Sequence, residues 1–424
     1  MHPLLAPLLA TAAPIALVNA RVHPVTSPPV DGCTMVIDGG RILAIGPDVV
    51  VPPDAAVVDL TGRVVVPGLI DLHSHVGGGR LHESLGPVQP AISAIDAIDP
   101  FHPSLDRARA GGITTVNVMP GSGKLMGGQT AYLSLRHSPT VDGMLVCLAA
   151  DAGDAEIEGP LRRTSVCGGT KMANGTNPQG SGGDPASRMG SAFLQRQALL
   201  RGQAWLDAQE AHDARRGRKR PAAPEPDPEA EALAELAAGQ RTVHFHSHRA
   251  DDVVTAIRLK QEFGIDLVVH HGSEGFKVAS LIAEADVPVA INVLDTPGGK
   301  EETLERRLDN PAILHAAGVR IALITDDPVQ DSRLFLRTGG LAVRGGLAPE
   351  AALRAMTLTP AELMGVADRV GSLEVGKQAD LVVLSGPPFS VWSQVEQTWV
   401  AGEVVFDRSD SAQTRFATGG DAAP

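Results

Sequence analysis

The strongest constraint on the fold of this chain is an alternation of apolar, strand-like runs with amphipathic helices that follows Pro67-Gly68. Amphipathic stretches such as Asp252–Phe263 and Phe276–Glu284 lie between several of these runs. The strand-like runs are Leu69–Leu72, Thr114–Val118, Ala131–Leu135, Thr170–Ala173, Val243–His246, Leu267–His270, Val287–Val293 and Ile321–Thr325. Alternating strands and helices are typical of a parallel sheet covered on its faces, and this strand count predicts an α/β fold, a (β/α)8 TIM barrel over residues 67–369.

Shorter apolar runs separated by turn signals precede this region: Ile15–Val18, Thr34–Ile37, Arg41–Ile45, Val57–Leu60 and Val64–Val66. Strands of this length and spacing predict a small β-sandwich or barrel. Strand-like runs return after Arg369, in a segment too short to form a domain of its own. We therefore expect a discontinuous β-sandwich domain composed of residues 15–66 and 370–407, followed by a disordered tail at 408–424.

Residues 180–240 interrupt the alternation. They contain a helical stretch at Ser191–Arg216, the basic run Arg215–Arg220, a proline-rich stretch and then an Ala/Glu-rich helix. An insertion of this length between strands is typically a lid or a mobile surface excursion, and we expect its first helix to cover the mouth of the barrel. A basic run can contact anions or nucleic acid, but in an acidic chain a solvated loop is the favoured interpretation.

Charge and composition argue against several classes of function. The chain has 424 residues, with 36 Lys plus Arg against 49 Asp plus Glu and a formal net charge of −13. Nucleic-acid and anionic-membrane binders need a basic surface, so neither partner is expected. Met1–Val18 is broken by prolines and has no Lys or Arg, which argues against a secretory signal or a membrane helix. We expect a soluble cytoplasmic protein, with self-association into a homo-oligomer left open.

The three cysteines are Cys33, Cys147 and Cys167. No two of them have the C-x-x-C spacing of a thiolate zinc site, and any disulfide scheme leaves one over. We therefore expect them to be reduced and to behave as small, buried apolar residues.

Histidine residues stand at the ends of the predicted strands. His73 and His75 end the first strand in a His-x-His pattern, and alternate residues of a strand face the same side. His246 and His271 end two later strands, and Asp326 ends the last. The carboxyl ends of barrel strands converge on one pocket, where imidazoles and a carboxylate would be costly to bury without a cation. The pattern therefore predicts a metal site at the mouth of the barrel.

Three motifs resemble the metal-dependent amidohydrolase superfamily. The first is Val65–His75, which reads Val-Val-Pro-Gly-Leu-Ile-Asp-Leu-His-Ser-His, and the last is Gly371–Val383, where the chain would return to the β-sandwich. Between them, His246, His271 and Asp326 stand in the family's order. The resemblance covers nearly the whole chain. It is closest to imidazolonepropionase-related and prolidase-like amidohydrolases, because of the His-Ser-His-Arg-Ala-Asp-Asp stretch and His271-Gly272.

The resemblance implies a set of metal ligands. His73 and His75 would bind one metal with Asp326, and His246 and His271 would bind the same metal or a second one. This donor set favours zinc, as one or two ions, while other divalent metals also fit.

The resemblance also assigns Lys171 a position at which some members carboxylate a lysine to bridge two metals; a lysine that ends a strand or holds substrate is the alternative. Gly175-Thr176-Asn177 stands where close relatives have Gly-Glu-Asn, and the missing carboxylate favours a single metal. His244 and His270 alternate with or adjoin the expected ligands, so we expect them to support the wall of the pocket.

Other residues are candidates for contacts around the metal. His248 and Arg249 could bind a substrate carboxylate, because arginine offers a bidentate fork; a surface role at the start of a helix is the alternative. Gln129 follows a glycine-rich loop and is expected to line the pocket. Asp327 is placed to orient a ligand histidine.

The function predicted from these residues is hydrolysis of a linear or cyclic amide C–N bond in a small-molecule substrate. Asp326 would hold the attacking water, take its proton and pass it to the leaving nitrogen. Either His271 or a substrate-binding histidine would stabilise the oxyanion. A deaminase of a nitrogen heterocycle is the first alternative, but it needs a proton-shuttling glutamate, for which Glu274 is the nearby candidate. A non-catalytic, metal-poor binding protein of this family is the second alternative.

Overall fold

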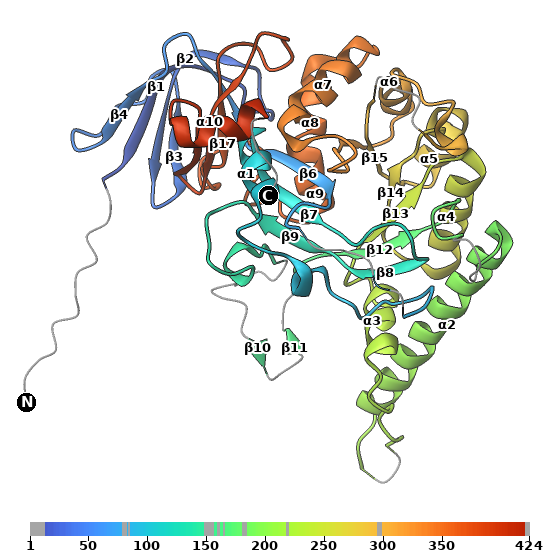
Figure 1. Ribbon diagram of the computed structural model, residues 1–424. Helices are drawn as coiled ribbons and strands as arrows, with labels where there is room; N and C mark the ends of the chain where they lie inside the picture. The colour runs from blue at the N-terminus through green and yellow to red at the C-terminus, as the bar shows by residue number, and fades with distance from the viewer. Residues whose placement is uncertain are drawn as a thin grey trace, which may run out of the picture.

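The computed structural model describes residues 13–78, 83, 85–147, 157–158, 162–163, 166–179, 185–217, 220–294 and 299–419. The described chain is a mixed α/β protein in which one sheet lies beside a larger region of strands and helices (Figure 1). No helix among these residues is long and apolar enough to cross a membrane.

The first sheet combines strands from both ends of the sequence. It contains β1 (Ile15–Val22), β2 (Val30–Asp38), β3 (Arg41–Gly46), β4 (Ala56–Asp59), β5 (Val64–Pro67), β17 (Leu381–Leu384), β18 (Val395–Val400) and β19 (Glu403–Asp407). The strand order is β19-β18-β17-β5-β1-β2-β3, with β4 paired to β1. The antiparallel pairing of β17 with β5 joins the two chain segments in one continuous hydrogen-bonded sheet, which does not confirm the expected sandwich.

The expected barrel strands are present, but they form two sheets. One has the order β16-β15-β14-β13-β12-β8 and the other β6-β7-β9. Their bounds are β6 (Leu69–Ser74), β7 (Ile113–Val118), β8 (Met126–Gln129), β9 (Ala131–Ser134), β12 (Thr170–Ala173), β13 (Val243–Ser247), β14 (Leu267–His271), β15 (Val289–Ile291) and β16 (Ile321–Leu323). The expectation of an all-parallel sheet is wrong in two places, because β9 pairs antiparallel to β7 and β8 antiparallel to β12.

Backbone hydrogen bonds connect the two sheets at both edges. The amide of Asp326, just after β16, donates to the carbonyl of His73 in β6 at 2.9 Å. The amide of Tyr132 in β9 donates to the carbonyl of Cys167, just before β12, at 2.8 Å. The described strands do not close into a single hydrogen-bonded ring.

Helices follow or connect most of these strands. They are α1 (Pro103–Ala110), α2 (Arg188–Asp213), α3 (Pro228–Ala237), α4 (Ala250–Phe263), α5 (Ala279–Glu284), α6 (Asn310–Ala316), α7 (Phe335–Arg344), α8 (Pro349–Ala355), α9 (Leu358–Leu363) and α10 (Ser411–Thr418). Helix α10 packs against α1 and β19. The short 3-10 helices are Ala94–Ala97, Asp142–Met144, Gly275–Val278, Glu301–Thr303 and Ser332–Leu334, and the two-residue strands β10 (Ile157–Glu158) and β11 (Arg162–Arg163) pair with each other.

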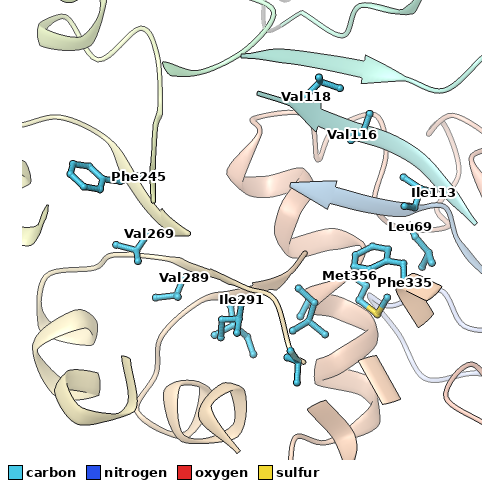
Figure 2. Packing of buried hydrophobic residues seen from close by; sticks show 14 of the residues in the cluster. Leu69, Ile113, Val116, Val118, Phe245, Val269, Val289, Ile291, Phe335 and Met356 are labelled. Carbon is cyan, nitrogen blue, oxygen red and sulfur yellow. The ribbon is translucent and has the colours of Figure 1, made fainter. Parts of the chain in front are cut away.

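The alternation of side chains along each strand separates the core from the site. Phe245, Val269 and Val289 lie in the hydrophobic cluster between strands and helices (Figure 2). His244 and His246, on either side of Phe245, therefore face the opposite, inner side of β13. The apolar core thus fixes the direction in which the histidines point.

Two of the expectations about flexible or reduced segments need correction. The predicted disordered tail is wrong for residues 408–419, because α10 forms there and packs against α1; residues 420–424 lie outside the described part. Cys147 and Cys167 form a disulfide, so they are not reduced, whereas Cys33 is buried and free as expected. The expected helices of the 180–240 insertion are present as α2 and α3, which pack against each other.

Candidate metal centre and active site

The first cluster of predicted site residues lies where β6 meets the end of β16. His73 Nε2 and His75 Nε2 lie 3.3 and 3.2 Å from Asp326 Oδ1. His73, His271 and Asp326 offer ligand atoms that all lie within 4.8 Å of one another. Residues from separate strands therefore lie together at this point.

The second cluster consists of His246, His248 and His271. Their ligand atoms also lie within 4.8 Å of one another, and all three residues are buried. The ring centroids of His246 and His271 are 4.4 Å apart, and those of His248 and His271 are 4.7 Å apart. His271 belongs to both clusters, so the two form one continuous site. His248, predicted as a substrate contact, lies among the candidate ligands.

The backbone of two of these residues adopts a strained conformation that directs the side chain into the site. His271 has φ 72° and Asp326 has φ 58°, in the left-handed region that residues other than glycine rarely adopt. On a regular strand His270 and His271 would face opposite sides, so the turn at His271 brings its ring into the site. Such conformations cost about 1–3 kcal/mol each and cluster at functional sites.

Hydrogen bonds at Nδ1 leave Nε2 available on two histidines. His75 Nδ1 donates to the carbonyl of Met119 at 2.7 Å. His271 Nδ1 lies 3.2 Å from Asn292 Oδ1, and its Nε2 is buried with no hydrogen-bond partner among the described residues. A donor on Nδ1 leaves a lone pair on Nε2, the arrangement that metal-binding histidines use. The orphaned Nε2 of His271 therefore fits a divalent cation.

Burial keeps these imidazoles neutral. Desolvation lowers the pKa of His73, His246 and His271 well below the ordinary 6.5, and it lowers the pKa of His248 to about 3. The neighbouring cations and imidazoles act in the same direction. Neutral imidazole is the form that binds a metal, so this environment suits a metal centre.

Lys171 is fully buried beside the first cluster. Its Nζ lies 3.3 Å from His73 Nε2 and 3.1 Å from Met119 Sδ. Burial lowers the pKa of this amine to about 7, while the charge of Asp326 opposes the shift. Because part of the amine is unprotonated near neutral pH, its nitrogen is available as a nucleophile towards CO₂ or as a ligand partner.

The two histidines expected to support the wall form a buried hydrogen-bonded chain. Tyr132 Oη lies 3.0 Å from His244 Nε2, and His244 Nδ1 lies 2.9 Å from His270 Nε2. His270 Nδ1 then lies 3.0 Å from His73 Nδ1. This chain holds the His73 ring from the side opposite Asp326, in agreement with a supporting role.

The three other candidate contacts are Arg249, Gln129 and Asp327. The guanidinium of Arg249 binds Asp251 through two hydrogen bonds of 2.9 and 2.8 Å at the start of α4. Gln129 in β8 pairs with Thr170, the first residue of β12 and the one before Lys171. Asp327 Oδ2 accepts from the amide of Ser332 at 2.9 Å, so the side chain holds the following loop. The backbone carbonyl of Asp327 accepts from the amide of His75 at 3.0 Å.

Several polar residues that contact the site were not predicted. Asn292 follows β15, and the rule of polar residues at strand ends would have found it. Asn177 Nδ2 lies 3.2 Å from His246 Nε2, and Ser122 Oγ lies 3.0 Å from His246 Nδ1. Asp71, which accepts from the amide of His73 at 3.2 Å, lies inside the recognised motif but has no metal-binding spacing.

Comparison with known proteins agrees with this geometry. A model of the amidohydrolase family matches residues 224–405. An amidohydrolase, tasK, from Hapsidospora irregularis is 27% identical over 84% of this chain, which spans 38% of that relative's length. An imidazolonepropionase from Brucella suis biovar 1 is 24% identical over 84% of this chain and 87% of its own.

A solved structure of an amidohydrolase from Thermotoga maritima MSB8 is 33% identical to this chain. The similarity covers 93% of this chain and all of that one, with a TM-score of 0.82. An adenosine deaminase from Xanthomonas campestris with bound zinc has the same general fold, with a TM-score of 0.55 at 20% identity.

Proposed function

Because the chain belongs to the amidohydrolase family, we propose that it is a metal-dependent hydrolase of an amide C–N bond, linear or cyclic, in a small molecule. The observation that supports this most directly is the buried Nε2 of His271, which has no hydrogen-bond partner in the described part of the chain. His271, His73 and Asp326 offer ligand atoms within 4.8 Å of one another. Neutral imidazoles and a carboxylate that converge in this way are suited to a cation.

We also propose that the two inner sheets are arcs of one (β/α)8-type barrel, since backbone hydrogen bonds join them at both edges. Residues 15–66 and 370–407 would then be a composite second domain, a single sheet in place of the expected sandwich. The barrel would extend over residues 67–369.

His73, His75, His271 and Asp326 would hold the metal, with His246 completing the site or binding a second ion. Zinc suits this donor set best, and other divalent metals also fit. The bound ion would polarise the scissile carbonyl and make water more acidic.

Within this site Asp326 takes the proton of the attacking water and delivers it to the leaving nitrogen, so that an acid and an amine are the products. His248 Nδ1 lies 2.8 Å from Ser273 Oγ. When that hydroxyl donates to Nδ1, Nε2 has the proton and can donate to the developing oxyanion.

The deaminase alternative is disfavoured because Glu274, its candidate proton shuttle, is engaged elsewhere. Glu274 Oε2 accepts from the amide of Ala250 at 3.0 Å, and its other oxygen pairs with Lys277 at 3.1 Å. The carboxylate is thus engaged at the start of α4 and not in the histidine cluster. A non-catalytic role is disfavoured because the whole candidate ligand set is present.

Metal analysis of the purified protein tests the proposal. We expect stoichiometric divalent metal in the wild type and at least about a tenfold lower affinity in His73→Ala, as for loss of a direct ligand. His315→Ala, which alters an exposed histidine of α6, is the matched control. Unchanged metal content in His73→Ala would contradict the assignment, and full turnover by Asp326→Asn would contradict its role in proton transfer.

A further inference from the structure

Arg306 has a guanidinium that nothing in the described chain neutralises at close range. Its Nε is buried and has no hydrogen-bond partner among the described residues, and no ion pair there includes its side chain. The side chain is half-buried, and even partial burial of a cation without a paired anion costs free energy. An unpaired guanidinium in such a position suggests that an anionic ligand binds to it.

The segment containing Arg306 is fixed beside the candidate ligands at both of its ends. Lys300 Nζ donates to Asn177 Oδ1 at 2.7 Å, and Asn177 Nδ2 lies 3.2 Å from His246 Nε2. Asn310 Nδ2 donates to the carbonyl of Gly272 at 3.0 Å, immediately after His271. Residues 300–310 therefore extend from the side of His246 to the side of His271.

The neighbours of Arg306 are engaged elsewhere. Glu305 is exposed and pairs with Lys277 at 2.9 Å. Arg307 is also exposed; its guanidinium pairs with Asp309 and lies 4.9 Å from the ring centroid of Phe276. Arg306 is the more buried member of this triplet.

The charge of Arg306 reaches the active site. It favours the neutral form of His248 and so helps to lower the pKa of that imidazole, after desolvation and Lys300. In turn, the charge of Asp326 acts on Arg306 and opposes the decrease in its pKa that burial causes. Arg306 and Lys300 therefore add positive charge around the histidine cluster.

We propose that Arg306 binds a carboxylate of the substrate, so that the enzyme acts on amides with an acid group beside the scissile bond. This inference rests on the proposed hydrolase function. The buried Nε and an adjacent Nη form a fork that matches a carboxylate. The guanidinium of Arg249 is not free for this role, because it already donates two hydrogen bonds to the carboxylate of Asp251. Arg306 is thus a specificity-determining residue.

The test compares acids with their neutral counterparts. Wild type, Arg306→Met, Arg306→Lys and Arg307→Met, each purified with its metal, are assayed on a panel of N-acetyl amino acids and on the same compounds as primary amides. Acetate release measures hydrolysis of the acetyl C–N bond, and calorimetric titration measures binding independently of turnover. The thermal midpoint of each variant confirms that it is folded.

We expect wild type to prefer the acids over the matching amides by about tenfold or more in kcat/KM, because charge-assisted hydrogen bonds are the stronger class. Arg306→Met lowers kcat/KM for the acids about 10- to 100-fold, mainly through KM, and leaves the amides within about twofold. Arg306→Lys restores part of the preference, and Arg307→Met behaves as wild type. Arg306→Met also melts no lower than wild type, since its Nε has no partner to lose.

Equal use of acids and amides by wild type, or an equal loss on both in Arg306→Met, would overturn the inference. If no compound is hydrolysed, the proposed hydrolase activity is contradicted for this panel. The calorimetric titrations then test separately whether Arg306 binds a carboxylate. Acids that bind at least about tenfold more tightly than amides to wild type, but not to Arg306→Met, would support it. Equal binding, or no binding of any acid, would refute it.

Discussion

Asp380 is a buried carboxylate whose charge we predict to destabilise the fold, and Asp380→Asn tests this. It directly precedes β17, where the C-terminal strands join the first sheet. Its Oδ1 accepts from the amide of Ala401 at 2.7 Å, while Oδ2 is buried without a partner among the described residues. Burial raises the pKa of Asp380 from the ordinary 3.8 to about 6, although the hydrogen bond from Ala401 opposes the shift.

The direction of the shift determines the pH dependence. A folded-state pKa above the unfolded value means that the folded protein holds the proton more tightly, so stability decreases as pH rises from about 4 to about 6. The two values correspond to a cost of about 1 kcal/mol at pH 4.5 and about 3 kcal/mol at pH 7.5. An asparagine at position 380 keeps an oxygen for Ala401 and has no charge to desolvate.

Thermal unfolding at pH 4.5 and pH 7.5 measures the effect. The unfolding entropy expected for a chain of this length is about 0.9 kcal/mol per kelvin, so Asp380→Asn gains about 3 °C over wild type at pH 7.5. The gain shrinks to about 1 °C at pH 4.5. Asp48→Asn, at an exposed position, is the control for loss of one charge. A gain that is absent at pH 7.5, or that is larger at pH 4.5, would refute the argument.

Two further substitutions test the support of the metal site and the core. Asn292→Leu removes the acceptor of His271 Nδ1 and is expected to weaken metal binding about 10- to 100-fold, measured by competition with a chelator. Asn292→Asp keeps an acceptor and should keep the metal affinity. Equal metal affinities in the two variants would contradict this prediction. Phe335→Ala empties a fully buried position in the cluster of Figure 2 and should cost about 3–5 kcal/mol, seen as a thermal midpoint lower by about 4 °C. A decrease below about 1 °C would mean that the surrounding residues refill the cavity.

The sequence predicts the strands and the separation of core from site well, because both depend on local periodicity. Phe245 stands between His244 and His246, and this period of two is visible in the sequence itself. The order and direction of strands in the sheets are harder to predict from the sequence. The antiparallel pairing of β8 with β12 depends on contacts between distant segments, and the disulfide between Cys147 and Cys167 depends on a proximity that spacing alone does not reveal.

The same distinction separates the predicted ligands from the residues around them. His73, His75 and Asp326 follow from their places at strand ends, which the fold brings together. Arg249 was expected to bind a carboxylate because of its neighbours in sequence, yet the local partner Asp251 engages it. Arg306 lies in no recognisable motif, and only the three-dimensional arrangement shows that its Nε lacks a hydrogen-bond partner among the described residues. Substrate specificity in such a site therefore depends on loop residues such as Arg306, which can bind substrate because no protein group in the described chain occupies them.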